Sequence, residues 1–411
     1  MSRHTQRVAI LHPAFSGVGG AELLAISQAK CLHEQGFDVC MITSTIDQTR
    51  WHDEFRGLRT ELLGASDWLD ELAGRETWIA RRVKRLEKLL VNIDVAVAHN
   101  YPMSRMLAHA NTNARKIWYC NEPFREIHLD ATHPTLAKRA DSGIPAATSA
   151  EKEFARHRRR QRDSWLGIRS KRVSEGLRDL ATVDKLELIC PDSNFACTLA
   201  TRTYGSRPYR VLYPVVRFPE SWPSRHGLDR SELRILVQTR LTPEKNVDTI
   251  LRGFAAFLAG ARSRAQLYIV GNGPCSAELH QLAKELNIEA ATHFCGFVSD
   301  QELIRIHEMC EVFVLLSIDE PFGLVFPEAA ARGLLLVGPD HGGPFEILEQ
   351  GRLGFTTDPF APEQLASALE RVMSLSDVEV DRLRVAADES CRDRFSASTI
   401  TPQMISTYEL T

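Results

Sequence analysis

The chain has 411 residues, of which 44% are hydrophobic and 25% charged, and its formal net charge at pH 7 is −3. This composition is typical of a globular enzyme, excludes a disordered or collagen-like chain, and gives no sign of nucleic-acid binding. The length exceeds what one ordinary hydrophobic core supports, so two domains of similar size are expected.

Short β-like segments alternate with helical patterns in both halves of the chain. The predicted strands are residues 8–11, 39–43, 95–98, 117–120, 186–189, 210–213, 233–237, 266–270, 293–295, 312–316 and 334–337. The clearest helical patterns are residues 21–34, 247–258, 275–286 and 300–308. Strands that alternate with helices favour parallel, doubly wound sheets of the α/β class.

A proline-rich segment divides this alternation into two series. Residues 213–223 contain three prolines, which predicts an interdomain linker. We therefore expect two Rossmann-like domains, residues 1–213 and 217–395, that face each other across a cleft. Residues 396–411 follow the helices of the second domain and are expected to pack back onto the first.

Two segments carry an excess of positive charge. In residues 78–90 the apolar side chains recur at helical spacing between basic ones, which predicts a basic amphipathic helix. Residues 152–178 hold ten Lys or Arg against three Asp or Glu. Solvated helix faces account for most such runs. The alternative is a cationic surface that approaches anionic lipid head groups, so peripheral membrane contact is a hypothesis for both segments.

The sequence also bears on location. No uninterrupted apolar run reaches the roughly 18 residues of a membrane-spanning helix, and the apolar residues 8–11 are too few for a signal-peptide core. The nine cysteines include no C-x-x-C pair, which predicts neither a disulfide framework nor a zinc knuckle. We expect a cytoplasmic protein, with any peripheral contact at the inner membrane face.

Two carboxylates, Glu320 and Glu328, lie eight positions apart just after the predicted strand 312–316. A strand that ends in a loop opening a helix directs backbone N–H groups toward anionic ligands. Carboxylates accept hydrogen bonds from vicinal hydroxyls, so this pair suits a sugar nucleotide. One acidic loop residue plus an ordinary helix glutamate is the alternative. The intervening Phe322, Gly323 and Leu324 favour the binding site.

Arg240 and Lys245 follow the predicted strand 233–237 in a second strand–loop–helix transition. Arginine clamps two phosphate oxygens in a fork, and lysine supplies a point charge. A departing diphosphate needs such cations because its negative charge grows as the glycosidic bond breaks. A pair of surface cations is the alternative, which the two glutamates in the same half make less favourable.

Glycines occupy two other loops that follow predicted strands. Gly19 and Gly20 precede the first helix, and Gly271 follows strand 266–270. Glycine lets the backbone approach a phosphate closely, although a plain tight turn is an alternative at both places. The first loop is not G-x-G-x-x-G and no acidic residue ends the second strand, which disfavours a nicotinamide oxidoreductase.

Polar residues also end two strands of the first half. His99 and Asn100 close strand 95–98, where the histidine could hydrogen-bond a sugar hydroxyl or carry a proton. Glu122 and Arg125 follow strand 117–120 and are candidates for binding an acceptor. The sequence shows no cluster of metal ligands, so we expect neither a metal site nor a permanently bound cofactor.

Taken together, these motifs resemble the retaining glycosyltransferases of family 4, which have the GT-B fold. The resemblance covers nearly the whole chain and depends on residues 239–241, 244–246, 269–274, 320–324, 328–329, 341–346 and 354. It implies that Arg240 and Lys245 bind the diphosphate of the donor and that Glu328 binds the ribose hydroxyls. It also implies that Glu320 and the amides of Gly323 and Leu324 hold the donor sugar and phosphate.

The resemblance extends to the first half and to the mechanism. It implies that Gly19 and Gly20 meet the diphosphate from the opposite domain and that His99 lies beside the transferred sugar. Members of this family need no bound metal and keep the anomeric configuration of the donor, by a front-face attack in which the leaving phosphate helps to deprotonate the acceptor.

Residues 119–125 resemble the acceptor-side loop of mannosyltransferases that build lipid-linked glycans, which favours GDP-mannose as donor and leaves UDP-hexoses open. The leading hypothesis is a transferase that moves a hexose to a hydroxyl of a glycan, a lipid-linked acceptor or a small molecule. The alternatives are an epimerase or phosphorylase of the same fold, and a non-catalytic subunit that binds sugar nucleotides.

Overall fold

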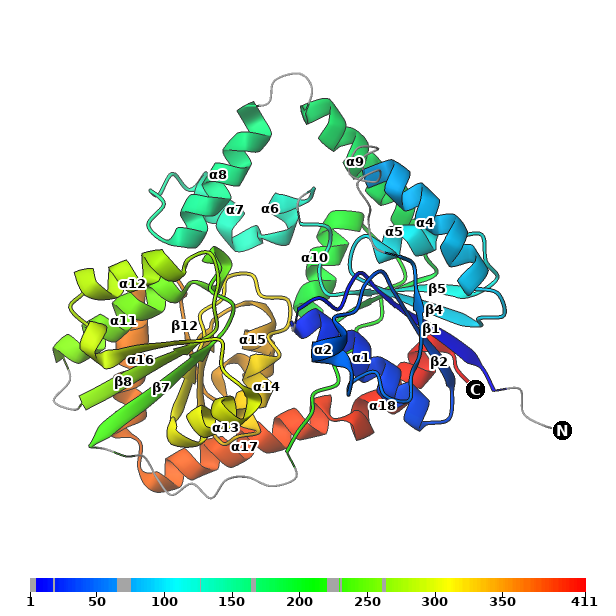
Figure 1. The fold of residues 1–411 in the computed structure, drawn as a ribbon. Helices are drawn as coiled ribbons and strands as arrows, with labels where there is room; N and C mark the ends of the chain where they lie inside the picture. Colours follow the sequence, from blue (N-terminus) through cyan, green and yellow to red (C-terminus); the bar gives the residue numbers. More distant parts are fainter. Residues whose placement is uncertain are drawn as a thin grey trace. The chain divides into compact units, whose positions relative to one another are not determined.

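The structure is a computed structural model, and it describes residues 5–17, 19–64, 75–125, 127–163, 168–219, 229, 231–260 and 264–411. The chain forms two compact units, shown in Figure 1. Unit 1 comprises Met1–Thr132, Trp165–Val215 and Ala397–Thr411, and unit 2 comprises His133–Ser164 and Val216–Ser396.

Unit 1 is built on a parallel six-stranded sheet in the order β3-β2-β1-β4-β5-β6. Its strands are β1 (Arg7–His12), β2 (Asp38–Thr43), β3 (Arg59–Leu62), β4 (Val95–His99), β5 (Arg115–Cys120) and β6 (Leu188–Pro191). Its helices are α1 (Gly20–Glu34), α2 (Gln48–Trp51), α4 (Arg75–Leu89), α5 (Met103–His109), α6 (Leu129–Thr132), α9 (Ile168–Val183), α10 (Asn194–Tyr204) and α18 (Ala397–Tyr408). The middle strands are buried, as expected for a parallel sheet covered on both faces.

Unit 2 repeats this topology, with strand order β12-β11-β10-β7-β8-β9. Its strands are β7 (Glu232–Gln238), β8 (Arg264–Val270), β9 (Thr292–Gly296), β10 (Val312–Val314), β11 (Leu335–Pro339) and β12 (Phe355–Thr357). Its helices are α7 (Pro134–Asp141), α8 (Ser149–Asp163), α11 (Val247–Gly260), α12 (Ser276–Glu285), α13 (Asp300–Met309), α14 (Val325–Ala330), α15 (Gly342–Ile347), α16 (Pro362–Ser374) and α17 (Asp377–Phe395), with short 3-10 turns η1 (Pro243–Lys245), η2 (Glu289–Ala291) and η3 (Glu349–Gly351).

The predicted alternation of parallel strands and helices is confirmed, with three differences. Residues 210–213 do not form a strand; only Tyr209 makes an isolated bridge to Ile189. Strands β3 and β12 were not predicted. Strand β3 is a short edge strand with mostly exposed side chains, so its sequence lacks the apolar run that marks the inner strands.

The division into units differs from the predicted boundary in one segment. Residues 133–164 were expected in the first domain, but helices α7 and α8 cluster with unit 2. They do so because both helices hydrogen-bond to side chains of that unit, as described below. Residues 397–411 form part of unit 1, where α18 packs against α1 and the Tyr408 hydroxyl donates a hydrogen bond of 2.9 Å to Gln28.

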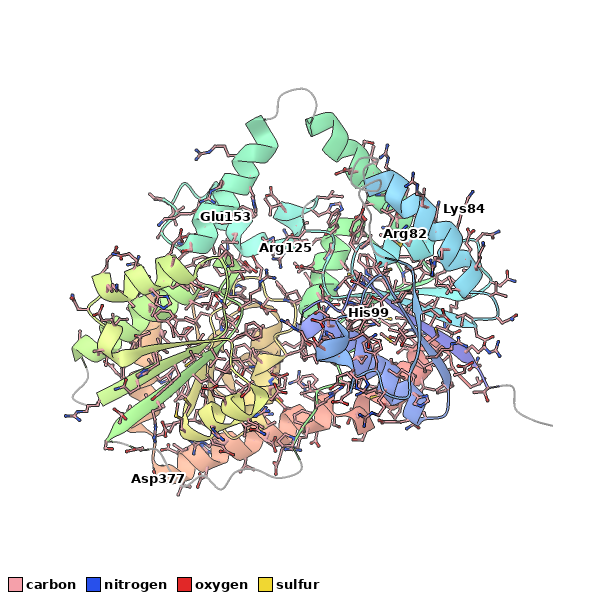
Figure 2. The ribbon with its side chains drawn as sticks, viewed as in Figure 1. Arg82, Lys84, His99, Arg125, Glu153 and Asp377 are labelled. Atoms are coloured by element: carbon pink, nitrogen blue, oxygen red, sulfur yellow. The ribbon has the colours of Figure 1, made fainter. Side chains whose placement is uncertain are left out.

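Helix α4 contains most of the predicted basic amphipathic helix, and its apolar face is buried. Ile79, Val83 and Leu86 lie in one core cluster with residues of β4 and α5, while Lys84 projects to solvent (Figure 2). The described apolar side chains of this face therefore pack in the core of unit 1 and are not available to enter a bilayer. In α8, Arg158 and Arg156 form ion pairs with Asp141 and Glu153, which reduces the excess of positive charge there.

The burial of α4 gives a prediction for stability. We expect Leu86→Ala to lower the free energy of unfolding by about 2–5 kcal/mol, because it removes a fully buried side chain and leaves a cavity. The matched variant Lys84→Ala, two residues away on the exposed face, should change stability by less than about 0.5 kcal/mol. Thermal and denaturant unfolding of both variants would check this. Equal effects would contradict the buried orientation of α4.

Candidate functional site

Lys245 and Glu320 form an ion pair at the centre of the sheet of unit 2. Lys245 lies just after β7 and Glu320 just after β10, and these two strands are neighbours although β8 and β9 separate them in the chain. This is the topological switch point of the sheet, where α/β proteins bind ligands beyond the carboxyl ends of their strands. The structure thus brings together two of the residues that the sequence analysis selected.

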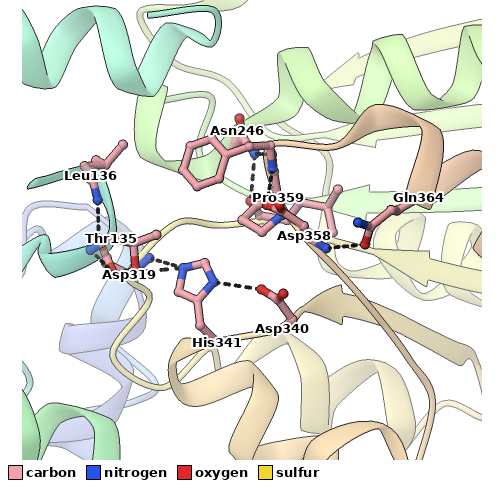
Figure 3. Close-up of polar contacts among 11 residues, drawn as sticks. Thr135, Leu136, Asn246, Asp319, Asp340, His341, Asp358, Pro359 and Gln364 are labelled. Carbon is pink, nitrogen blue, oxygen red and sulfur yellow. Dashed lines mark hydrogen bonds and ion pairs between the residues drawn. The ribbon is translucent and has the colours of Figure 1, made fainter. Parts of the chain in front are cut away.

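The side chain of Asn246 links the loops that carry Lys245 and Glu320 from within the core. It is fully buried, and its backbone is left-handed at φ +56°. Its side-chain amide donates hydrogen bonds of 3.1 Å to the carbonyl of Leu316 and 2.7 Å to that of Pro359 (Figure 3). The Ile318 amide also donates to the Glu244 carbonyl at 2.9 Å. The loops after β7, β10 and β12 are therefore fixed to one another beneath the ion pair.

Glycines allow the loop after β8 to lie against the loop after β7. A Cβ on Gly271 would fall 1.9 Å from the carbonyl oxygen of Thr239, and one on Gly273 would fall 2.3 Å from that of Leu241. Gly271 also has φ +127°. These contacts explain the glycines as requirements of loop packing. Contact of Gly271 with a phosphate stays a prediction.

The loop after β11 lies against the segment that carries Glu320. The Gly343 amide donates a hydrogen bond of 2.8 Å to the Glu320 carbonyl, and a Cβ on Gly343 would fall 2.2 Å from the carbonyl oxygen of Pro321. The ring of His341 accepts a hydrogen bond of 3.2 Å from the Asp319 amide through Nε2, and its Nδ1 lies 3.2 Å from Asp340 (Figure 3). Glu320 is thus held on both sides by backbone contacts.

The other selected residues of unit 2 have different environments. Arg240 is exposed, and its guanidinium forms no ion pair with a described residue. Phe322 is buried against Phe395, with ring centroids 5.2 Å apart, so its side chain belongs to the core. Gly323 has φ +93°, and Leu324 immediately precedes α14.

Glu328 lies within α14, as the spacing of the two glutamates predicted. Its carboxyl is half-buried, and desolvation raises its pKa from 4.5 to about 7, with Arg332 opposing the shift. At neutral pH this group therefore exists as a mixture of carboxyl and carboxylate, and either form can hydrogen-bond a hydroxyl.

In unit 1, His99 is buried within a hydrogen-bonded group. Its Nε2 lies 3.2 Å from the side-chain oxygen Oε1 of Gln28, which also accepts a hydrogen bond from the Tyr408 hydroxyl, and its ring stacks on Tyr119 with centroids 4.8 Å apart. Burial lowers its pKa well below 6.5, with the nearby His12 as a second cause. His99 is therefore neutral at pH 7, which disfavours the proton-carrying role and leaves hydrogen bonding.

Sequence reasoning missed His12. It ends β1 as His99 ends β4, these strands are neighbours at the switch point of unit 1, and the two ring centroids lie 6.4 Å apart. Burial lowers the pKa of His12 to about 4, so it too is neutral. The sequence signal for His12 was its position at the carboxyl end of the first predicted strand, which in a doubly wound sheet lies at the switch point.

The glycine loop before α1 contains a nearby carboxylate. Gly19 is the extended N-cap of α1 and Gly20 its first residue, and the Glu22 carboxylate lies 2.7 Å from where a Cβ on Gly19 would be. A diphosphate at this turn would meet that negative charge, so Glu22 would have to move. A phosphate contact of Gly19 and Gly20 stays a prediction.

The predicted acceptor residues also lie in unit 1. Asn100 follows β4 with a left-handed backbone at φ +57°. Arg125, labelled in Figure 2, donates to Glu122. The two side chains form an ion pair with each other at 2.8 Å. Neither observation assigns them a ligand.

No group of three or more His, Cys, Asp or Glu side chains in the described part of the chain is arranged to hold a metal ion. No described helix is both long and apolar enough to cross a membrane.

Comparison with known families identifies the C-terminal region. Residues 219–389, which include both loops of the ion pair, match the family described as Glycosyl transferases group 1. Over this region the chain is similar to the group 1 glycosyltransferases.

Curated relatives support the same assignment over part of their length. A D-inositol 3-phosphate glycosyltransferase from Nocardioides is 34% identical over 234 residues, which is 51% of this chain and 51% of that protein. A GDP-mannose-dependent mannosyltransferase of phosphatidylinositol monomannoside from Mycobacterium tuberculosis is 29% identical over 37% of this chain and 40% of that protein. The chain thus spans about half or less of the length of these relatives.

Solved structures resemble the whole chain in fold. HepE from Anabaena, in complex with UDP and glucose, has a TM-score of 0.73 at 17% identity and covers 99% of this chain and all of that one. Sucrose-phosphate synthase from Thermosynechococcus elongatus has a TM-score of 0.72 at 18% identity, covering 98% of each chain. With two parallel six-stranded sheets, the chain has the GT-B fold that was predicted.

The raised pKa of Glu328 predicts a pH dependence of stability. Between pH 4.5 and about 7 the unfolded chain releases this proton while the folded chain keeps it, so stability falls as pH rises through this window. We expect a change from pH 5 to pH 8 to cost the wild type about 2 kcal/mol more than Glu328→Gln, which cannot ionise. Denaturant unfolding at both pH values checks this. Parallel losses in the two proteins would contradict the shift.

Proposed function

We propose that this chain transfers a hexose from a nucleotide-diphosphate sugar to a hydroxyl acceptor. The observation that carries the proposal is the Lys245–Glu320 ion pair at the switch point of a sheet whose sequence is similar to the group 1 glycosyltransferases. A cation and a carboxylate in contact at this place match the two ends of the donor, because the diphosphate is anionic and the sugar presents hydroxyls.

We expect some residues of unit 2 to bind the diphosphate of the donor and others to bind its sugars. Arg240 is exposed and available to clamp phosphate oxygens, and Lys245 supplies a second positive charge. Glu320, together with the amides of Gly323 and Leu324, would hold the sugar and its phosphate, and the half-buried Glu328 would take the ribose hydroxyls. As diphosphate binds, Lys245 would exchange part of its contact with Glu320 for phosphate, which frees a carboxylate oxygen for the sugar.

The proposed reaction keeps the anomeric configuration. The acceptor oxygen forms a bond to the anomeric carbon while the bond from that carbon to the phosphate oxygen breaks. The nucleoside diphosphate leaves with the bonding electrons, and its phosphate oxygen takes the acceptor proton. The cations Arg240 and Lys245 stabilise the charge that develops, so this scheme needs neither a metal ion nor a protein base.

Unit 1 would supply the acceptor side. The neutral His99 suits a hydrogen bond to a hydroxyl of the transferred sugar, since its Nδ1 has no partner among the described residues. Asn100, Glu122 and Arg125 follow neighbouring strands and are proposed to bind the acceptor, and Gly19 and Gly20 to meet the diphosphate. GDP-mannose is the first donor to test, with UDP-hexoses next, because relatives with each kind of ligand are similar to this chain.

A test of the function combines binding and turnover. Thermal-shift screening against GDP-mannose and UDP-hexoses selects the donor, since a ligand that binds the folded state raises the unfolding temperature. With that donor, Lys245→Ala and Glu320→Ala should each lower kcat by about a hundredfold or more, and EDTA should leave wild-type kcat unchanged. Product formed without an acceptor would instead favour an epimerase.

A second ion pair between β7 and β10 provides a matched control for the loss of Lys245. Arg234 and Glu311 form an ion pair of 2.7 Å near the opposite ends of β7 and β10. Arg234→Gln therefore removes a similar pair from the same sheet and should leave kcat within about threefold of wild type. If it lowered kcat as much as Lys245→Ala, loss of the fold would explain both results and the assignment would be lost.

We also propose that any peripheral membrane contact is electrostatic and uses the exposed basic face of α4. Because the apolar face of α4 is buried, binding to vesicles with anionic lipid should fall to near zero when salt rises from 0.05 to 0.5 M. Cosedimentation at both salt concentrations measures this. Binding that survives high salt, or no binding at low salt, would contradict it.

A further inference from the structure

Helices α7 and α8, with the loop between them, form an arm (residues 133–163) attached to unit 2. The chain enters the arm directly after Thr132 of unit 1, yet the arm packs on unit 2, where α8 contacts η1. Since η1 ends at Lys245, the arm touches the turn that carries one of the proposed phosphate ligands.

The first anchor of the arm is the buried carboxylate of Asp319, the residue before Glu320. It accepts hydrogen bonds from the Thr135 hydroxyl at 2.6 Å, from the Thr135 amide at 3.2 Å and from the Leu136 amide at 3.5 Å (Figure 3). These amides belong to the first turn of α7, whose own N-cap, His133, makes no capping bond. Asp319 therefore acts as the N-cap of α7 from another part of the chain.

The second anchor repeats this arrangement at α8. The Ser149 amide, the first of that helix, donates a hydrogen bond of 2.7 Å to Asp248, three residues after Lys245. Thr148 and Glu151 exchange the hydrogen bonds of a capping box and complete this helix start. The start of α7 thus binds a carboxylate beside Glu320, and the start of α8 binds a carboxylate near Lys245.

A third set of contacts joins α7 to α8 and joins α7 to the loop after β12. Arg139 of α7 donates to Glu151 of α8 at 2.6 Å, and its guanidinium stacks 3.9 Å from the ring centroid of Phe360. The neighbouring Pro359 carbonyl is the one that Asn246 holds. The arm and Asn246 therefore act on the same loops, and each restricts their movement.

We propose that the arm positions the donor site, with Asp319, Thr135 and Asp248 as positioning residues that fix the loops carrying Glu320 and Lys245. This inference rests on the proposed function. Asp319 has a left-handed backbone at φ +53°, which is uncommon for a residue other than glycine, and the α7 cap adds contacts that hold it. Weakening the cap lets Glu320 leave the geometry in which it meets the sugar.

The test compares Thr135→Val, which removes only the hydroxyl donor, with Thr135→Ser, which keeps it. We expect Thr135→Val to raise the donor KM about tenfold with kcat reduced less than threefold, and Thr135→Ser to restore the wild-type KM. Asp319→Asn should raise the KM further, because its amide group would face the amides of α7. The control Ser299→Ala removes the cap of α13 in the same unit and should leave KM unchanged.

The outcomes separate this inference from the proposed function. If GDP and UDP each fail to raise the unfolding temperature of the wild type and no donor is turned over, the function is wrong and the inference falls with it. If the wild type binds and turns over a donor while Thr135→Val and Asp319→Asn keep its KM, the arm is merely structural and the inference alone is overturned. A KM raised equally by Ser299→Ala would overturn it as well.

Discussion

The candidate site depends on one constraint, the side-by-side pairing of β7 and β10 in a parallel sheet. Parallel strands end at the same edge, so the loops after these two strands must meet although much of unit 2 separates them in the chain. The contact of Lys245 with Glu320 and the hydrogen bond from Asn246 to Leu316 follow from this pairing. The packing of Gly343 on Glu320 follows in the same way from the pairing of β10 with β11. A sheet with another strand order would leave the same residues apart.

The sheet of unit 1 has the same order but a different chemistry at its switch point. Two neutral histidines, His12 and His99, stand there in a buried aromatic setting, where unit 2 has opposite charges. Neutral imidazoles suit hydroxyl groups, whereas a lysine beside a carboxylate suits a ligand with both phosphate and hydroxyls. One topology, used twice, thus carries neutral imidazoles at the switch point of unit 1 and an ion pair at that of unit 2.

The sequence predicted the fold well because parallel strands leave a strong local signal. Val312 and its neighbours are apolar on both faces, and β10 was found from that run alone. Lys245 and Glu320 were found because each follows such a run. By contrast, the exposed strand β3 and the position of His12 were missed. Strand β3 forms by pairing with β2, and His12 is placed beside His99 by the pairing of β1 with β4, and neither pairing can be read from the local sequence.

The boundary at residues 133–164 shows the same limit. Helix α7 was not predicted, and the partners of the first turns of α7 and α8, Asp319 and Asp248, lie far along the chain. The first turn of α7 has no capping bond from its own N-cap residue, His133. In the sequence, a helix start without a capping residue is the only sign that a distant residue caps it. Such a sign indicates that a partner exists without identifying it.

The chain passes between the two units at four places, and this has a consequence for biosynthesis. Helix α18, formed by residues 397–408, supplies the Tyr408 hydroxyl that binds Gln28 in unit 1. During translation the first unit therefore cannot complete its core until these residues leave the ribosome, and the arm waits similarly for Asp319. Neither unit is a separate folding module in the order of synthesis. A chain stalled just before residue 397 would expose the surface of unit 1 that α18 covers to chaperones and proteases.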